Sequence, residues 1–143
     1  MKKKVLIING PNMNMLGRRP KEHYGSLTLD EVNQKIIEEN NGYFELEFFQ
    51  SNSEGDIITK LQEAISYAGI LINPASYTHT SIGIRDALEM CEGIKIEIHL
   101  SKVDEREPFR RVNIVRDVCD TCYQGLHENS YIEALKYLKE NIR

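Results

Sequence analysis

Three short apolar runs in this chain each end abruptly in polar residues that can bind a ligand or transfer a proton. The runs are 5–8, 70–72 and 94–98, and the polar segments that follow them are 9–12, 73–81 and 99–101. In open α/β sheets, the ligand lies outside the carboxyl ends of the strands. The pattern therefore predicts a sheet whose strand ends bring polar groups that are distant in sequence into one crevice.

Strand-like and helix-like segments alternate along the chain. We expect strands at 4–9, 44–50, 69–73, 94–99 and 117–123, and helices at 29–40, 55–67, 81–91 and 128–141. Repeated strand–helix units predict a parallel sheet covered by helices on both faces. We expect one domain over residues 1–143 with a flavodoxin-like α/β fold and strand order 2-1-3-4-5. The segment 117–123 is too polar for a central strand and fits an edge.

The first helix carries clear local signals. Thr28 and Glu31 have the spacing of a capping box, in which each side chain bonds the other residue's backbone N–H. Val32, Ile36 and Ile37 are expected on the buried face of this helix.

Composition excludes several classes of protein. The chain has 143 residues, of which 28% are charged and 41% hydrophobic, so it reads as globular. Its net charge of −4 disfavours nucleic-acid binding. No apolar run reaches the roughly 18 residues of a membrane span. The apolar stretch after Lys2–Lys4 is too short for a signal peptide, so we expect a cytoplasmic protein.

The cysteines and histidines do not form a metal-binding or redox pattern. Cys119 and Cys122 match C-x-x-C, but they lie in a strand-like segment rather than at the start of a helix. No second cysteine pair completes a zinc site. There is also no H-E-x-x-H, G-x-G-x-x-G or P-loop motif. We expect reduced, structural thiols, no metal and no cofactor.

The long connection 10–24 is expected to be a binding loop or lid. It contains Asn12, Arg19 and Tyr24. A neighbouring guanidinium favours the ionised form of a phenol, which makes Tyr24 a candidate base. The alternative is a solvated loop whose arginines meet surface carboxylates.

The segment after the third strand offers groups that recognise hydroxyls. Asn73 provides both a donor and an acceptor, as vicinal hydroxyls require. His79 is a second candidate, although it could instead cap the following helix. Arg85 and Asp86 lie one turn further on, where a surface ion pair is the alternative interpretation.

The fourth strand provides a candidate acid. Glu97 and His99 are two residues apart, so their side chains lie on one face of the strand. A carboxylate beside an imidazole fixes its tautomer and favours its protonated form, as a general acid requires. The alternative is a hydrogen-bonded core histidine. Arg106 and Arg110 add cations from the next loop, whereas Arg111 fits a surface patch.

These side chains include a candidate base, a candidate acid, cations and hydroxyl readers, but no nucleophile with a partner base. The combination indicates proton abstraction and elimination on a small polyol acid, without a cofactor.

Several longer motifs resemble those of the type II 3-dehydroquinate dehydratases. They are 6–17 with Arg19 and Tyr24–Gly25, 50–52 with 54–55, 72–74 with 77–81, 85–88, 97–101 and 106–110. The resemblance covers the chain up to about residue 127. The segment 111–113 departs from the small, apolar pattern that is usual in that family.

The resemblance implies a hydro-lyase that converts 3-dehydroquinate into 3-dehydroshikimate by anti elimination through an enolate, in the shikimate or quinate pathway. It implies a flavodoxin-like fold assembled as a homododecamer, a tetramer of trimers. It implies no cofactor, no metal, no nucleic acid and no membrane partner.

The resemblance also assigns catalytic roles to six side chains: Asn12, Arg19, Tyr24, Glu97, His99 and Arg106. Tyr24 would remove the proton next to the ketone, helped by the two arginines. Asn12 would hold a water against the enolate oxygen. His99, oriented by Glu97, would protonate the departing hydroxyl.

The substrate-binding residues implied by the resemblance are Asn73, His79, Asp86, Leu100, Ser101 and Arg110. Asn73, His79 and Arg110 would read hydroxyls, and the backbone of residues 100–101 would hold the carboxylate. Asp86 would come from a neighbouring subunit, and the loop 18–24 would close as a lid.

Two other classes of function remain as alternatives. A non-catalytic quinate-type ligand-binding protein on the same scaffold needs hydroxyl readers but neither an acid nor a base. A flavin or receiver module of flavodoxin type needs a hydroxyl-rich phosphate cradle or paired acids after the first strand, and neither is present.

Overall fold

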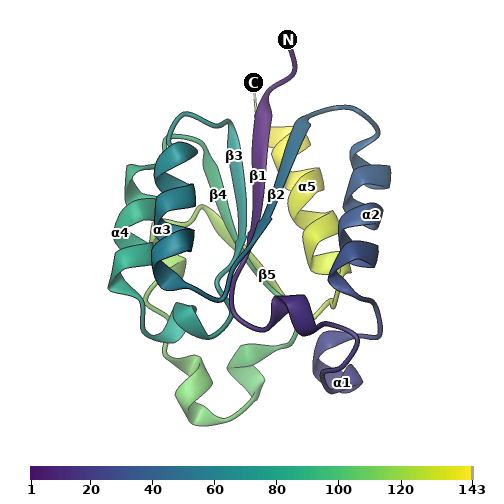
Figure 1. The fold of residues 1–143 in the computed structure, drawn as a ribbon, viewed down its shortest axis with the longest axis vertical. Coiled ribbons are helices and arrows are strands. Elements are labelled where there is room, and N and C mark those ends of the chain that lie inside the picture. The colour runs from purple at the N-terminus through teal and green to yellow at the C-terminus, as the bar shows by residue number, and fades with distance from the viewer. Residues whose placement is uncertain (143) are drawn as a thin grey trace.

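The computed structural model describes residues 1–142, which form a five-stranded sheet between two layers of helices (Figure 1). The strands are β1 (Lys4–Asn9), β2 (Glu45–Gln50), β3 (Gly69–Asn73), β4 (Ile94–His99) and β5 (Thr121–Gln124). Every neighbouring pair is parallel, and the order is β2-β1-β3-β4-β5. The predicted fold class and strand order are confirmed, including the edge position of the polar last strand.

The helices divide between the two faces of the sheet. They are α1 (Lys21–Tyr24), α2 (Leu29–Asn40), α3 (Glu54–Glu63), α4 (Ile82–Met90) and α5 (Asn129–Asn141). Helices α2 and α5 cover one face, α3 and α4 cover the other, and the short α1 lies below the sheet in Figure 1. No helix within residues 1–142 is both long and apolar enough to cross a membrane.

Strand β1 supplies the centre of two separate cores because alternate side chains point to opposite faces. Val5 and Ile7 pack with the α2/α5 layer, and Leu6 and Ile8 pack with the α3/α4 layer. All four are fully buried. This burial on both faces explains why the strand is a continuous apolar run rather than an alternating one.

The register of the sheet aligns the ends of its central strands. Asn9, the last residue of β1, is level with Gln50 in β2 and with Asn73 in β3. The polar segments that follow these strands therefore leave the sheet at the same edge, as the sequence predicts.

Local signals set the ends of α2. The Thr28–Glu31 capping box is present in both directions, and Asn41 ends the helix in a left-handed conformation. Val32 and Ile36 are buried as expected, but Ile37 is 45% exposed, so its predicted burial is wrong. Ile37 lies about 100° around the helix from its neighbour and falls outside the buried stripe.

Two predicted boundaries are wrong by four residues each, and the long first loop contains regular turns. Helix α3 ends at Glu63 rather than 67, because the next residues turn back toward β3. The loop 10–24 contains a 3₁₀ turn at Met13–Met15 as well as α1. Strand β5 begins at Thr121 rather than 117, because Arg116–Val118 form another 3₁₀ turn. Further 3₁₀ turns lie at Ala75–His79, Val103–Glu105 and Pro108–Arg111.

Gly10 allows the end of β1 to touch the segment after β3. Its N–H donates to the carbonyl of Asn73 at 2.8 Å. A Cβ at this position would lie 2.6 Å from the Pro74 carbonyl oxygen, closer than van der Waals contact allows. Glycine is therefore required where two loops of the strand-end edge meet.

We predict that Gly10→Ala lowers the free energy of unfolding by about 1–3 kcal/mol, because the added methyl group must push backbone apart. Gly55→Ala is the matched control. A Cβ there meets only Ser53 Oγ, at 3.8 Å, and alanine is the better helix former. Urea unfolding of both variants checks the prediction. Equal stability of Gly10→Ala and the wild type would contradict it.

Candidate active site

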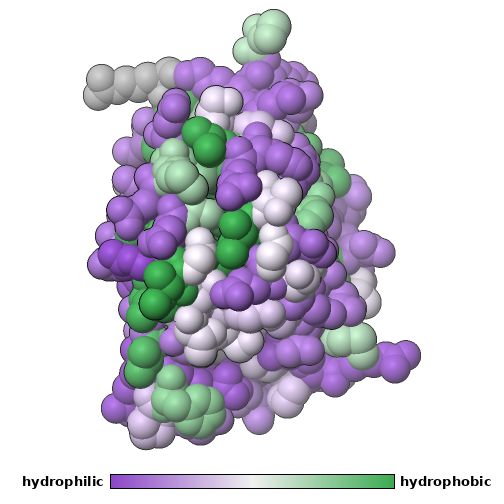
Figure 2. Space-filling view, turned by 60° about the vertical axis from the view of Figure 1, so that its left-hand side comes forward, coloured by the Kyte–Doolittle hydropathy of each residue, from purple (hydrophilic) through white to green (hydrophobic). Residues whose placement is uncertain are grey.

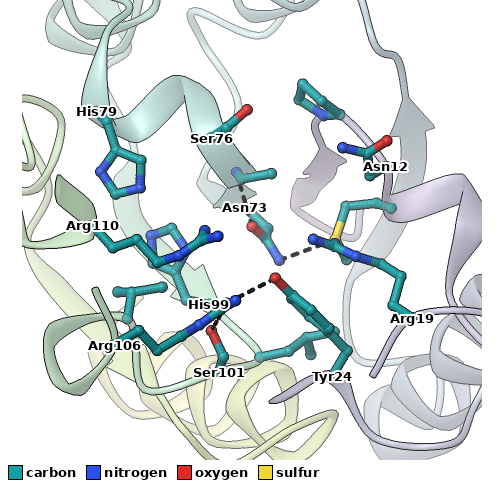
Figure 3. Close-up of a pocket in the computed structure, with 15 residues that line it drawn as sticks. Asn12, Arg19, Tyr24, Asn73, Ser76, His79, His99, Ser101, Arg106 and Arg110 are labelled. Carbon is teal, nitrogen blue, oxygen red and sulfur yellow. Dashed lines mark hydrogen bonds between the residues drawn. The ribbon is translucent and has the colours of Figure 1, made fainter. Parts of the chain in front are cut away.

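A cavity of about 210 Å³ lies at the carboxyl ends of the strands (Figure 3). Ten of the twelve predicted site residues line it: Asn12, Arg19, Tyr24, Asn73, His79, His99, Leu100, Ser101, Arg106 and Arg110. They come from the first loop, from the ends of β3 and β4, and from the loop that follows β4. The parallel sheet thus gathers groups that are up to about 100 positions apart in the chain.

Two arginines contact the Tyr24 phenol. The guanidinium carbon of Arg19 lies 3.5 Å from the centre of the ring, and Arg106 Nη1 donates to the Tyr24 hydroxyl at 2.8 Å. Arg106 Nη1 also donates to Ser101 Oγ at 3.1 Å, which fixes the guanidinium against the end of β4. Two guanidinium groups thus lie against the phenol, one over its ring and one at its hydroxyl.

The cavity is strongly cationic. Burial lowers the pKa of the Arg19 guanidinium; the neighbouring Tyr24 opposes this effect, and the charges of Arg106 and Arg110 add to it. Among residues 1–142, no aspartate or glutamate lines the cavity, and Glu107 accepts from Arg110 Nε at 3.1 Å outside it. The volume is below the roughly 300–1,000 Å³ of pockets for drug-sized ligands. The site suits a small anion.

Glu97 does not line the cavity but lies behind His99. The carboxylate is fully buried, and its Oε2 lies 2.6 Å from His99 Nε2. Burial raises the pKa of Glu97, but hydrogen bonds from His99, Thr78 and Asn113, with the charge of His99, outweigh it and lower the pKa to about 2. Glu97 is therefore ionised at neutral pH. His99 Nδ1 has no hydrogen-bond partner among residues 1–142 and is the ring nitrogen left for a ligand.

Asn73 is held in one orientation by a buried chain of hydrogen bonds. Its Oδ1 accepts from the Ala75 N–H at 3.0 Å, and its Nδ2 donates to the Tyr131 hydroxyl at 3.3 Å. The Tyr131 hydroxyl in turn donates to Asn9 Oδ1. Residues Asn9 and Tyr131 were not predicted as part of the site. The sequence does contain a signal for Tyr131: a tyrosine on the buried face of a helix indicates a buried polar contact, because its hydroxyl needs a hydrogen-bond partner.

His79 lines the cavity and does not cap the following helix. Ser81 is the N-cap of α4, with its Oγ accepting from the Ile84 N–H at 3.0 Å. His79 Nδ1 is bonded to the carbonyl of Val112, so its ring is anchored from outside the cavity. The alternative interpretation of His79 as a helix cap is therefore wrong.

Asp86 is exposed on α4 and lies outside the cavity of this single chain. Its neighbour Arg85 pairs with Asp117 and, at 3.9 Å, with Glu89. Arg85 thus forms surface ion pairs with these two acids instead of the suggested pair with Asp86. Asp86 is the one predicted site residue that the chain does not bring near the rest.

The cysteines lie away from the cavity. Burial raises the pKa of the Cys119 thiol and raises that of Cys122 to about 11, with the negative charge of Glu97 adding to both. These thiols are protonated at neutral pH and are poor nucleophiles. Within residues 1–142, no group of three or more histidine, cysteine or acidic side chains is placed to hold a metal ion.

Comparison with known proteins agrees with this geometry. Residues 3–139 match the family model described as dehydroquinase class II. The chain is 44% identical over 139 residues to the 3-dehydroquinate dehydratase of Thermotoga neapolitana, covering 96% of this chain and 94% of that protein.

Two crystal structures of type II dehydroquinases superpose closely on this fold. The one from Butyrivibrio crossotus has a TM-score of 0.93 at 43% identity and covers 96% of this chain and 98% of that one. The one from Propionibacterium acnes has a TM-score of 0.92 at 33% identity and covers 99% of both. The family match includes every strand end that builds the cavity, and the chain belongs to the class II dehydroquinase family.

Proposed function

We propose that this protein is a 3-dehydroquinate dehydratase, a hydro-lyase that removes water from 3-dehydroquinate to give 3-dehydroshikimate. One observation carries the proposal. A phenol held by two arginines and an imidazole held by a buried carboxylate line the same small cationic cavity (Figure 3). Family membership supports the same reaction. The reaction belongs to the shikimate or quinate pathway.

Tyr24 is the proposed base. As phenolate it removes the proton next to the ketone of the substrate, and the Arg106 N–H at its oxygen stabilises the charge before the proton moves. Arg19, stacked on the ring, adds positive charge near the developing enolate. Asn12, on the same side of the cavity, holds a water against the enolate oxygen.

His99 is the proposed acid. Because Glu97 stays ionised, it keeps a proton on His99 Nε2, and the transferable proton is on Nδ1. His99 gives this proton to the departing hydroxyl, which leaves as water. Each turnover leaves one proton on Tyr24 and removes one from His99. The proton must return to His99 through the cavity, because Glu97 does not titrate near neutral pH.

The remaining cavity residues bind the substrate. Asn73, His79 and Arg110 face the side where the ring hydroxyls would lie, and the chain at Leu100 and Ser101 holds the carboxylate. The lid is the loop 18–24, which includes α1 and carries Tyr24. His127 Nε2 lies 3.2 Å from the carbonyl of Glu22, a contact that ties α1 to the segment before α5. Closure of this loop would complete the site.

We further propose a homododecamer built as a tetramer of trimers, with Asp86 of one subunit reaching the cavity of the next. Apolar side chains lie among hydrophilic ones on the face over α3 and α4 (Figure 2). On α4, Ile82 is 64% exposed and Met90 52% exposed, on either side of Asp86 in sequence. Exposed apolar groups of this kind are typical of subunit contacts.

The cytoplasmic location stays a prediction.

We predict that Tyr24→Phe lowers kcat by about 10²–10⁴-fold, the usual contribution of a general base. Ligand affinity should change little, because the ring still stacks on Arg19. Ultraviolet absorbance of the conjugated enone product measures turnover, and calorimetry with a substrate analogue measures binding. Tyr43→Phe is the matched control, since Tyr43 is exposed and remote from the cavity.

Unchanged turnover in Tyr24→Phe would contradict the assignment of the base. Loss of binding in this variant would make Tyr24 a positioning group instead. A wild-type protein that binds the analogue tightly but shows no turnover would favour the alternative function, a non-catalytic ligand-binding protein on the same scaffold.

We predict that Asp86→Ala lowers kcat/KM about tenfold or more, as expected when a charged hydrogen bond is lost from a site. Glu38→Ala on α2 is the control, because it removes another exposed negative charge, from the opposite layer of helices. Size-exclusion chromatography with light scattering accompanies the assay. Full activity of Asp86→Ala in an intact oligomer, or of a wild-type monomer, would refute the shared site.

A further inference from the structure

We infer that Arg116 is a positioning residue for His99: from the far side of Glu97, its guanidinium sets how tightly the imidazole holds its proton. Arg116 lies outside the cavity and was not among the predicted site residues. The inference deepens the proposed function and rests on it only for its kinetic consequence.

The Glu97 carboxylate is surrounded by hydrogen-bond donors. Its Oε2 accepts hydrogen bonds from Thr78 Oγ1 and His99 Nε2, and from Asn113 Nδ2 at 2.8 Å. Its Oε1 accepts hydrogen bonds from Asn113 Nδ2 at 3.0 Å and from Arg116 Nε at 3.4 Å. Of these donors, Arg116 is a permanent cation, and His99 is the one whose charge depends on protonation. Glu97 is therefore a fixed negative charge shared between one permanent cation and one titratable cation.

Arg116 lies between two carboxylates. Its Nε faces Glu97 on the inside, and its Nη1 donates to Asp104 Oδ2 at 3.1 Å on the outside. Asn113 joins the two partners, because its Oδ1 accepts from the Arg116 N–H at 2.8 Å while its Nδ2 bonds Glu97. The 3₁₀ turn that begins at Arg116 is thus fastened to the carboxylate by both backbone and side chain.

This arrangement is not what stability alone would select. Arg116 Nη2 is buried without a hydrogen-bond partner within residues 1–142, and an unsatisfied buried donor is unfavourable for folding. The side chain is also 35% exposed, so it does not fill the core. Its clearest physical effect is electrostatic, because it opposes part of the Glu97 charge that attracts the proton of His99.

The sign of the effect follows from the charges. Removing the Arg116 charge leaves Glu97 less compensated, so the imidazolium form of His99 is favoured and the ring loses its proton at higher pH. Removing the Asp104 charge acts in the opposite sense, because Arg116 is then less neutralised. Solvent around the exposed part of Arg116 screens both effects, so we expect shifts of about 0.5–1 pH unit rather than several.

Other titratable or charged groups also face His99 and its carboxylate. On the cavity side they are Arg19, Tyr24, His79, Arg106 and Arg110, and around the buried side they are Asp104, Cys119, Cys122 and Tyr131. A substitution at Arg116 leaves all of these residues in place, but it changes the charge that Asp104 and Cys122 face. The comparison of Arg116→Gln with Arg116→Lys, which keeps that charge, therefore isolates the effect of the charge.

The direct test is an NMR titration of the His99 ring in the full-length, assembled protein with isotope-labelled histidine. His99 is assigned by the signal that disappears in His99→Gln. In Arg116→Gln the titration midpoint should rise by about 0.5–1 pH unit, and in Arg116→Lys, which keeps the charge, it should stay near the wild type. Arg111→Gln is the matched control: Arg111 is exposed and lines no part of the cavity.

Asp104→Asn provides a second variant, at a partly exposed position. In this variant the titration midpoint of His99 should fall. If the His99 midpoint in Arg116→Gln equals that of the wild type and of Arg111→Gln, Arg116 is only structural and the inference is wrong. A fall in Arg116→Gln, or a rise in Asp104→Asn, would overturn it equally.

The kinetic consequence is a matching shift in the alkaline limb of the kcat–pH profile, since the acid must be protonated to act. In Arg116→Gln this limb should move to higher pH by the same amount as the NMR midpoint. If the NMR shift occurs but the wild type shows no dehydration at any pH, the proposed function fails while the inference about Arg116 stands.

Discussion

The buried Glu97 carboxylate is the group on which the arrangement of this site depends. A charge without solvent is tolerated only when it is paired and hydrogen-bonded on all sides. Glu97 therefore accepts hydrogen bonds from Thr78 before α4, from His99 at the end of β4, and from Arg116 at the start of a 3₁₀ turn. Because these contacts fill both oxygens, the carboxylate keeps its charge and the imidazole keeps one orientation toward the cavity.

The two proposed proton-transfer groups are held in different ways. His99 lies on a central strand, 4% exposed and fixed from behind by a buried carboxylate. Tyr24 ends a four-residue helix in a long loop, and its side chain is held by Arg19 of the same loop and by Arg106 of the loop after β4. In the proposed mechanism, a rigid acid opposite a base on the lid loop allows substrate to enter and the site to close afterwards.

In the proposed mechanism, the same positive charge serves both binding and chemistry. Arg19, Arg106 and Arg110 line a cavity to which the described part of the chain adds no acidic side chain, an arrangement that favours an anionic ligand. Two of these arginines also contact the phenol, so the charge that attracts the ligand stabilises the ionised base. The negative charge of the site is kept behind the histidine, where it acts on the acid without repelling the ligand.

The sequence by itself determined the order of the elements and the polar residues that follow the central strands. Capping at Thr28 and the alternation in β1 depend on residues a few positions apart, so they can be read locally. Ten predicted site residues reached one cavity because parallel strands end at one edge of the sheet.

Only the tertiary structure decided which distant groups complete the site. The Tyr24–Arg106 and Asn9–Tyr131 contacts join residues 82 and 122 positions apart, and Arg116 reaches Glu97 through a turn that reads as strand in the sequence. Such contacts have no local signature, because they depend on how packed elements place side chains in space. Asp86 is the limiting case, since a single folded chain leaves it exposed on α4, outside the cavity.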